Sequence, residues 1–328
     1  MNRRILPFLL LALALPSAVA TSAAPSVAPV PESGSTFDAG GGATLYVEVR
    51  GSGSGTPLFV VNGGPGFEHS YVHCSDVWDV LAKKRRVVFY DQRGTGRSGP
   101  LKAGQTCTLS DQVADLEAVR AHLGADRIDL LGHSWGGYLV MAYAALHGDH
   151  IAHLIIVDSA APKWSDTAFL FKDVYPEGTE RQQAVAFSEE LGDTNALHAD
   201  LREYMGMLFY SPDLRDRFLA KAPSYRYYRD VNKAVNDDLA RYDLNPELPK
   251  FRMPTLVITG RYDMNVAPST AWKIHKSIPG SEFAVFERSG HLPYFEEPDA
   301  FRNRLEQFLA RPGAADGSGQ AARSGKSQ

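Results

Sequence analysis

A serine between two glycines is the residue of this 328-residue chain whose surroundings most clearly suggest chemistry. Ser134 lies in "GHSWG", after the apolar segment 128–131 and before residues that favour a helix. A sharp turn from strand to helix needs glycine on both sides, because the serine backbone is strained and its neighbours are crowded. Such a turn exposes the hydroxyl above a sheet. The pattern therefore predicts that Ser134 is a nucleophile rather than a small residue in an ordinary turn.

A serine hydroxyl needs a base that removes its proton and an acid that orients the base. Asp263 follows the apolar segment 255–259, and His291 follows the segment 282–286. Each comes just after a predicted strand, in the chain order serine, acid, histidine that this kind of turn requires. The sequence predicts a triad of Ser134, Asp263 and His291, with Asp158 at the end of an earlier strand as the alternative acid.

Two backbone amides are expected to stabilise the oxyanion of the tetrahedral intermediate. One is the N–H of Trp135, directly after the serine. The other lies in the loop "NGGPG" at residues 62–66, where glycines let the backbone approach the reacting atoms. Gly64 is the predicted second donor, because two preorganised amides aimed at the developing charge are what acyl transfer requires.

The sequence predicts no catalytic or metal-binding role for several other polar residues. His147, His150 and His153 cluster in "HGDHIAH" but have no carboxylate or cysteine partner at ligand spacing, so neither a metal nor another cofactor is expected. His133 is expected to pack within the turn. The acids around His291 are expected to be solvated loop charges: Glu287, Glu296 and Glu297.

Short apolar runs alternate with longer helical stretches, which indicates an α/β fold: a mostly parallel, twisted sheet with helices on both faces. Strands are predicted at 44–50, 58–62, 87–90, 128–131, 154–158, 255–259 and 282–286. Strand signals vanish over 161–248, which predicts an all-helical cap between the core segments 36–160 and 249–310. Inserted there, the cap should lie over the carboxyl ends of the strands, where ligands bind in such folds.

The two ends of the chain have their own composition. Arg3 and Arg4 precede the apolar run 5–15, and Ala18-Val19-Ala20 offers a cleavage site, so residues 1–20 are predicted to be a signal peptide. The protein is then exported, to the periplasm or the medium, with no stable membrane anchor after cleavage; an uncleaved anchor stays open. Residues 21–35 are predicted to be a flexible leader and 311–328 a disordered tail.

Composition excludes several classes of protein. Hydrophobic residues make up 44% and charged residues 22%, as in soluble globular chains, and the formal net charge is −4. The densest basic run, "KKRR" at 83–86, leads directly into an apolar strand, so no nucleic-acid partner is expected. Cys74 and Cys107 leave two alternatives open, a single bridge or two separate thiols.

Several motifs together resemble the proline iminopeptidases, serine aminopeptidases of the α/β-hydrolase fold. "NGGPG", "DQRGTGRS" at 91–98 and "GHSWGG" are similar to family motifs, and "GRYD" and "SGHLPYFEEP" fit the family's acid and histidine loops. The similarity covers residues 36–310. It implies removal of an N-terminal residue, often proline, from short peptides, with the helical cap closing over the substrate.

The chain departs from the family pattern at two positions. Asn62 stands where the family's loop begins with histidine, and Met264 stands where some members carry an acid for the substrate ammonium. Acids of the cap are the remaining candidates for that ammonium, Glu203 among them, with Glu177, Glu180, Glu189, Glu190, Asp230, Asp237 and Asp238. An esterase or amidase for small acyl substrates is the alternative function, and a non-catalytic ligand binder is a third.

Overall fold

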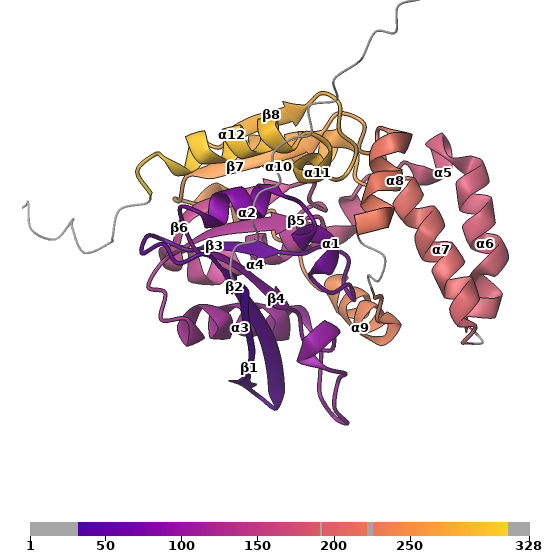
Figure 1. Cartoon of the computed structure of the whole chain (residues 1–328), viewed down its shortest axis with the longest axis horizontal. Helices are drawn as coiled ribbons and strands as arrows, with labels where there is room; N and C mark the ends of the chain where they lie inside the picture. The colour runs from indigo at the N-terminus through magenta and orange to yellow at the C-terminus, as the bar shows by residue number, and fades with distance from the viewer. Residues whose placement is uncertain (1–31, 191, 222–225, 314–328) are drawn as a thin grey trace, which may run out of the picture.

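An eight-stranded sheet forms the centre of the computed structural model, which describes residues 32–190, 192–221 and 226–313 (Figure 1). Its strands run in the order β1-β2-β4-β3-β5-β6-β7-β8. They are β1 (Glu32–Gly40), β2 (Ala43–Arg50), β3 (Leu58–Val61), β4 (Val87–Asp91), β5 (Ile128–His133), β6 (Ile151–Val157), β7 (Thr255–Gly260) and β8 (Glu282–Phe286). β2 pairs antiparallel with both of its neighbours, β1 and β4. All other neighbouring strands, from β4 to β8, pair in parallel. The predicted α/β class is confirmed.

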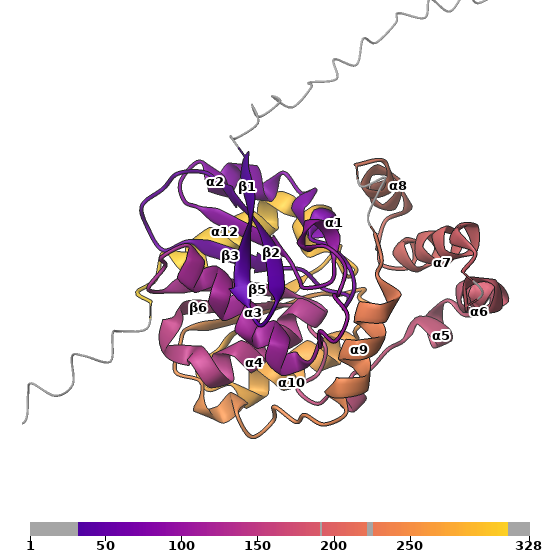
Figure 2. The ribbon, with the colours of Figure 1, turned by 90° about the horizontal axis from the view of Figure 1, so that it is seen from below.

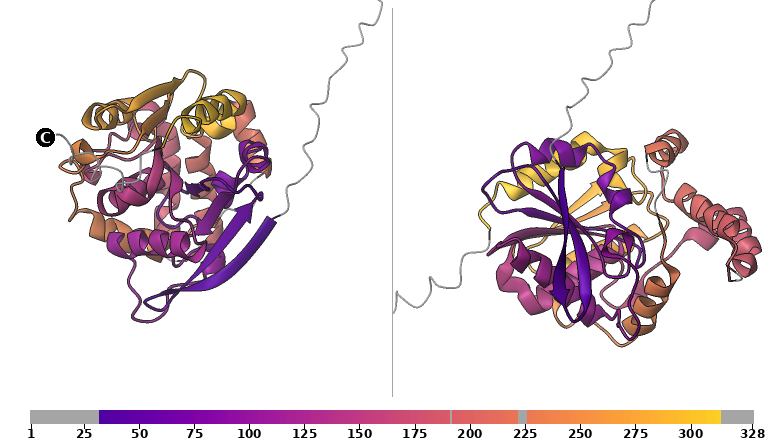
Figure 3. Two further views of the ribbon diagram at one scale, coloured as in Figure 1. Left: turned by 90° about the vertical axis from the view of Figure 1, so that its left-hand side faces the viewer. Right: turned by 60° about the horizontal axis from the view of Figure 1, so that its bottom comes forward.

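The first strand corrects the predicted start of the folded core. β1 pairs along its length with β2, so the predicted flexible leader 21–35 is wrong for residues 32–35. Its sequence, "ESGSTFDAG", has no apolar period, because the strand lies at the sheet edge and is held mainly by backbone pairing (Figure 3). The predicted signal peptide 1–20, the leader up to residue 31 and the tail 314–328 lie outside the described residues.

Helices cover both faces of the sheet (Figure 2). One face carries α3 (Leu109–His122), α4 (Trp135–His147) and α10 (Pro268–Ser277), and the other carries α2 (Val77–Ala82) and α12 (Pro298–Leu309). Successive residues of β3 belong to the two different clusters: Phe59 and Val61 to the first, Leu58 and Val60 to the second. A strand buried on both sides reads as a continuous apolar run, which explains why the sequence pattern located it.

The described residues between β6 and β7 form helices and loops, and none of them belongs to a strand of the sheet. It contains α5 (Phe171–Val174), α6 (Pro176–Glu190), α7 (Thr194–Gly206), α8 (Pro212–Lys221) and α9 (Arg229–Leu239), with single 3₁₀ turns at Trp164–Asp166 and Leu248–Lys250. α5 to α8 project to one side of the sheet, and α6 packs along α7, whereas α9 lies against α3 (Figures 1 and 2). Among the described helices, none combines the length and apolarity needed to cross a membrane.

Both cysteines are free thiols. Cys107 is part of the core on the α3 and α4 face, while Cys74 packs against the core on the opposite face. The sheet therefore separates them, and of the two alternatives left by the sequence, the structure has separate thiols. Burial raises the pKa of Cys107 to about 11, which keeps this thiol protonated and unreactive.

A buried ionic cluster joins β2 to the segment that carries α1 (Ser70–His73). His69 lies between two carboxylates, with its Nδ1 2.7 Å from Asp91 Oδ1 and its Nε2 3.4 Å from Glu48 Oε2. Arg50 donates to Glu48 at 3.1 Å and to Asp79 at 2.7 Å. Burial alone would lower the pKa of His69, but its hydrogen bonds to Asp91 and Glu48 outweigh burial and raise the pKa to about 9.

This cluster predicts a loss of stability in alkaline solution. Because the pKa of His69 is higher in the folded than in the unfolded chain, its contribution is complete below pH 6.5 and is lost as the pH rises through about 9. The difference between the pKa of His69 in the folded and in the unfolded chain corresponds to about 3 kcal/mol of folding free energy at most. Urea unfolding of the wild type should show this decline, and His69→Gln should flatten it. The exposed His198→Gln serves as control; an equal decline in all three proteins would contradict the prediction.

Candidate active site

Ser134 occupies the strained turn that joins β5 to α4. Its φ of 58° and ψ of −120° lie outside the regions that non-glycine residues favour. A Cβ on Gly132 would overlap the Gly136 carbonyl, and a Cβ on Gly136 would overlap the Val61 carbonyl. Both glycines are therefore required by close backbone approach. The turn lies where the strand order reverses, between β3 and β5, which is the usual ligand position in an open α/β sheet.

His291 and Asp263 form a buried pair beside this turn. His291 Nδ1 donates to Asp263 Oδ2 at 2.7 Å, and Asp263 Oδ1 accepts from the backbone N–H of Asn265 at 2.9 Å and of Val266 at 2.8 Å. Asp263, and not the alternative Asp158, thus orients the imidazole. With its proton on Nδ1, the ring presents Nε2 as the proton acceptor.

Asn265 contacts the imidazole of His291. Its Nδ2 donates to His291 Nε2 at 3.1 Å and lies 3.2 Å from Tyr204 Oη, and its side chain lines the same pocket as Ser134. Within the described part of the chain, Ser134 Oγ makes no hydrogen bond. Catalytic hydrogen bonds of this kind often form only with substrate bound. The sequence analysis missed Asn265, because only the fold turns the second residue after Asp263 toward the imidazole.

The two predicted oxyanion donors, Gly64 and Trp135, line the pocket together with Ser134. Trp135 is the first residue of α4, so its N–H has no acceptor within the helix. Gly64 has a φ of 54°, in the left-handed region that glycine tolerates. Their role as oxyanion donors stays a prediction.

Side-chain amides hold the oxyanion loop in place. Asn62 Nδ2 donates to the Gly63 carbonyl at 3.1 Å and to the Phe67 carbonyl at 2.9 Å, which closes the loop on itself. Gln92 Nε2 donates to the Asn62 carbonyl, and Gln92 Oε1 accepts from the Trp135 indole, each at 3.0 Å. Asn62 thus supports the loop despite its departure from the family motif. One role of the "DQRG" motif is therefore to hold the oxyanion loop against Trp135 through Gln92.

A chain of hydrogen bonds connects this loop to the segment that carries the base. The Gly63 N–H donates to Tyr71 Oη, which lies 2.9 Å from His133 Nδ1, and His133 Nε2 lies 2.7 Å from the His291 carbonyl. Burial first, and the nearby His291 second, lower the pKa of His133 well below its usual value, so the ring is neutral. Its Nε2 donates to the carbonyl, and its Nδ1 accepts from Tyr71. The expectation that His133 only packs was therefore incomplete.

Two of the acids near His291 are structural rather than solvated. Glu296 is buried and accepts from the backbone N–H of Gly290 and of Tyr210, at 2.5 and 2.7 Å. Glu297 accepts from Arg288 N and from Ser289 Oγ, each at 2.8 Å. The expectation of solvated loop charges is wrong for both, because these acids bond to the backbone just before His291. Only Glu287 is exposed, paired with Arg261.

The three histidines of "HGDHIAH" have different surroundings, and His147 stacks on the Tyr143 ring at 4.8 Å. His153 is buried between Asp129 and the Arg311 carbonyl, at 2.7 and 3.1 Å, and His150 lies 3.0 Å from the Asp126 carbonyl. No cluster of metal-ligating groups among the described residues includes these histidines.

The pocket above Ser134 is small and lined mainly by aromatic side chains. Its volume is about 260 Å³. Phe67, Trp164, Phe169, Tyr204 and Tyr227 form its walls, and its polar lining residues besides Ser134 are Gln182, Asp200, Asn232 and Asn265. Asp200 is the carboxylate in this lining. It comes from α7 of the cap, so the core supplies the nucleophile and the cap supplies the charge.

Known proteins are similar in sequence to this chain over most of its length. The family model of the alpha/beta hydrolase fold matches residues 56–298. A proline iminopeptidase of Saccharolobus solfataricus is 30% identical over 281 residues, covering 82% of this chain and 89% of the relative. A proline iminopeptidase of Neisseria gonorrhoeae is 31% identical over 302 residues, covering 81% of this chain and 93% of the relative. The chain belongs to the proline iminopeptidase family of α/β-hydrolases.

Solved structures agree with this fold. A hydrolase from Pseudomonas aeruginosa PA01 is 26% identical, with a TM-score of 0.64 and coverage of 85% of this chain and 98% of that structure. An esterase from Exiguobacterium antarcticum has a TM-score of 0.66 at 24% identity, with coverage of 85% and 100%. The predicted resemblance to the family is confirmed, and the protein is an enzyme, a hydrolase.

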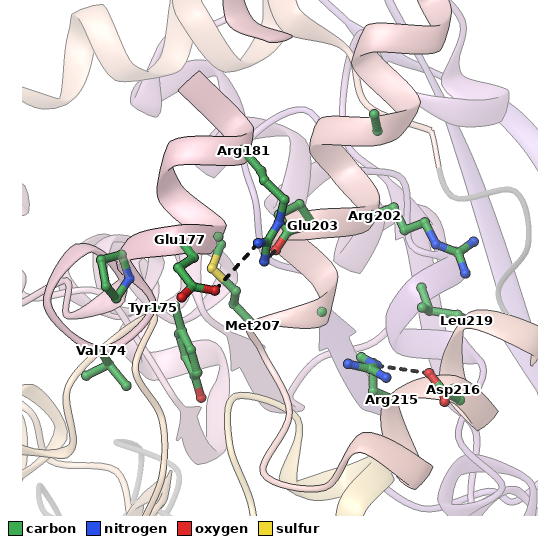
Figure 4. A pocket seen from close by; sticks show the side chains of 14 residues that line it. Val174, Tyr175, Glu177, Arg181, Arg202, Glu203, Met207, Arg215, Asp216 and Leu219 are labelled. Atoms are coloured by element: carbon green, nitrogen blue, oxygen red, sulfur yellow. Dashed lines mark hydrogen bonds and ion pairs between the residues drawn. The ribbon is translucent and has the colours of Figure 1, made fainter. Parts of the chain in front are cut away.

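Glu203, the acid predicted by name as a candidate for the substrate ammonium, faces a different pocket from Ser134. It pairs with Arg181 at 2.7 Å and lines a cavity of about 770 Å³ between α5, α6, α7 and α8 (Figure 4). Glu177 lines the same outer cavity and is exposed. Ser134 does not line this cavity. The sequence analysis did not single out Asp200, because a helix pattern alone does not show which acid of α7 faces the core.

The other candidate acids of the cap have partners or face solvent. Glu189 is buried against Arg229, Asp237 pairs with Lys233, and Asp238 accepts from the Leu109 N–H at 2.8 Å. Glu180 and Asp230 are exposed. The side chain of Glu190 lies outside the described residues. None of these acids lines the pocket that contains Ser134.

The hydrogen-bond chain through Tyr71 predicts a specific catalytic defect in this family member. Tyr71→Phe removes the acceptor of the Gly63 N–H and the donor to His133, so the oxyanion loop loses a fixed partner, and so does the ring that bonds to the His291 carbonyl. Loss of one such hydrogen bond should lower kcat about five- to tenfold with little change in KM. Steady-state kinetics would measure this.

Tyr90→Phe is the matched control, because the buried Tyr90 hydroxyl has no hydrogen-bond partner among the described residues. Equal losses of kcat in both variants would show that the chain through Tyr71 has no catalytic role.

Proposed function

We propose that the protein is a serine aminopeptidase that releases a small N-terminal residue, including proline, from short peptides. The observation that carries this proposal is Asp200, a carboxylate in the same small pocket as Ser134. A free N-terminal ammonium is a cation, and a cation in an apolar pocket must be paired. The names of the relatives, proline iminopeptidase, support the same substrate class.

The surroundings of Asp200 suit an ammonium group. Its Oδ1 accepts from Gln182 Nε2 at 2.8 Å, so the carboxylate is oriented. Burial raises the pKa of Asp200 and outweighs the Gln182 hydrogen bond and the positive charge of Arg229, so its ionised form is only partly compensated. A substrate ammonium would supply that compensation. The pairing would be stronger here than on an exposed surface, because Asp200 is partly buried.

The size and walls of the pocket favour a small, apolar first residue. The Phe67 and Tyr227 rings lie 5.0 Å apart, and the Trp164 and Phe169 rings 6.2 Å apart. A volume of about 260 Å³ is below the usual range of about 300–1,000 Å³ for drug-sized ligands. A pyrrolidine ring or a short aliphatic side chain fits this space and these surfaces.

The proposed reaction follows from the roles of three side chains. Ser134 Oγ attacks the carbonyl carbon of the first peptide bond while its proton passes to His291 Nε2, after the Asn265 amide has moved aside. The Trp135 and Gly64 amides stabilise the oxyanion. His291 then gives the proton to the leaving amine, which leaves an acyl-enzyme ester on Ser134. A water molecule, deprotonated by His291, hydrolyses this ester and regenerates the enzyme.

Asp200→Asn tests the ammonium site. Loss of a charged hydrogen bond costs about 1.5–3 kcal/mol, so kcat/KM for prolyl and alanyl arylamides should fall about 10- to 100-fold, mainly through KM. Turnover of a short acyl ester without an amine should change little. Kinetics on both substrate types would separate loss of recognition from general damage.

Glu203→Gln is the matched control, since Glu203 lies on the same helix but lines the outer cavity. It should retain wild-type kinetics, and Ser134→Ala should abolish turnover of every substrate. A wild-type preference for N-blocked arylamides or esters over free-amine substrates would overturn the aminopeptidase proposal and favour an esterase or amidase.

We also propose, from the sequence of residues 1–20, that the enzyme is exported. Signal peptidase cleavage after Ala20 would leave Thr21 as the mature N-terminus. Expression of the full chain in a bacterial host, followed by cell fractionation and N-terminal sequencing, should recover a form that begins at Thr21 outside the cytoplasm. Recovery of an intact N-terminus in the cytoplasmic fraction would refute export.

A further inference from the structure

Asp158 is a buried acid that the reaction described above does not use. It directly follows β6, is 1% exposed, and has a φ of 45°, a conformation that residues with a side chain rarely adopt. Its Oδ1 accepts from the Gly260 N–H at 2.8 Å. Its Oδ2 is buried, and no donor among the described residues bonds to it. A buried polar atom without a donor is costly unless it carries a proton of its own.

Asp158 lies beside Asp263, the acid that orients His291. One ligand-type atom from each of Asp158, Asp263 and His291 lies within 4.8 Å of the other two. Both carboxyl groups are almost completely shielded from solvent, at 1% and 0% exposure. Two ionised carboxylates at this separation repel each other strongly in a medium of low dielectric constant. One of the two must hold a proton.

The hydrogen bonds decide which one. Asp263 receives three donors: the Nδ1 of His291 and two backbone amides. Asp158 receives fewer: the Gly260 amide at 2.8 Å and the hydroxyl of Thr259. Donors stabilise the ionised form, so the negative charge belongs to Asp263. In agreement, burial and then the charge of Asp263 raise the pKa of Asp158 well above its usual value.

We propose that Asp158 is a neutral carboxylic acid whose Oδ2 hydroxyl donates a hydrogen bond to Asp263, making it a positioning residue behind the triad. This role rests on the proposed function of Asp263 and His291. The added donor stabilises the charge on Asp263 and reduces the pull of that charge on the imidazolium that forms at His291. Asp158 thereby sets the acidity of the base without touching the substrate.

Other titratable groups surround Asp158 and Asp263, and substitutions at Asp158 leave all of them in place. They are His291 and the neutral His133, with Tyr204 from α7, Tyr294 from α11 (Pro293–Glu296), and Glu296. Substitutions at Asp158 change only the proposed hydrogen bond from Asp158 to Asp263. Differences among those variants therefore report on that hydrogen bond.

The pH dependence of kcat/KM tests the proposal by its sign. Asp158→Ala removes a neutral donor, leaves the charge of Asp263 less dispersed, and should move the acid limb to higher pH, by about half to one unit. Asp158→Asn keeps a donor of the same shape and should retain the wild-type profile. If Asp158 is instead ionised, both substitutions remove a negative charge and move the acid limb to lower pH, which would overturn the proposal.

Infrared spectroscopy supplies a readout that does not depend on turnover. The difference spectrum of wild type minus Asp158→Asn should contain the carbonyl band of a protonated carboxylic acid, shifted in D₂O. Absence of this band would refute the protonated state, even if the enzyme is an aminopeptidase. If the band is present but the wild type does not cleave free-amine substrates, the protonated state of Asp158 stands and the proposed function is refuted instead.

Discussion

Close backbone approach around Ser134 is the constraint on which the rest of the structure depends. The nucleophile is exposed only because β5 turns sharply into α4, and the turn fits only because Gly132 and Gly136 have no side chain to collide with the neighbouring backbone. Such strained conformations cost about 1–3 kcal/mol and persist when the surroundings fix them. Here the surroundings are β3 and β6, which flank β5 in a sheet buried on both faces. The helices that cover the sheet therefore stabilise the catalytic turn indirectly.

Buried polar groups transmit this rigidity to the rest of the site. Gln92 joins the oxyanion loop to the Trp135 indole, while Tyr71 and His133 join the same loop to the backbone of His291. Neighbouring residues of "DQRGTGRS" extend the network, since Asp91 accepts from His69, and Arg93 binds Asp115 through two nitrogens at 2.6 and 2.7 Å. None of these side chains needs to contact substrate. Their satisfied hydrogen bonds hold two loops at one separation, which acyl transfer requires.

The sequence predicted those parts of the molecule that local patterns determine. Strands buried on both faces are continuous apolar runs, and the triad residues follow three such runs in a diagnostic order. β1 escaped prediction because an edge strand held by backbone pairing has no apolar period. The roles of Glu296 and His133 also escaped, because each depends on partners more than sixty residues away or on a loop that only the fold brings near. The sequence does not show whether a given carboxylate or imidazole is solvated or buried.

The proposed recognition of a substrate ammonium depends on a still smaller geometric difference. Asp200 and Glu203 lie within one turn of α7, yet Asp200 lines the pocket of Ser134 and Glu203 lines the outer cavity with Arg181. Residues three positions apart on a helix differ by about 60° in direction, which separates one face from the next. Tyr204, four positions after Asp200, lines the inner pocket as well. Moving a carboxylate by a few positions along this helix would therefore create or remove an ammonium site while the sheet, the turn and the triad stay unchanged. Hydrolysis is fixed by the core, and recognition can vary with the cap.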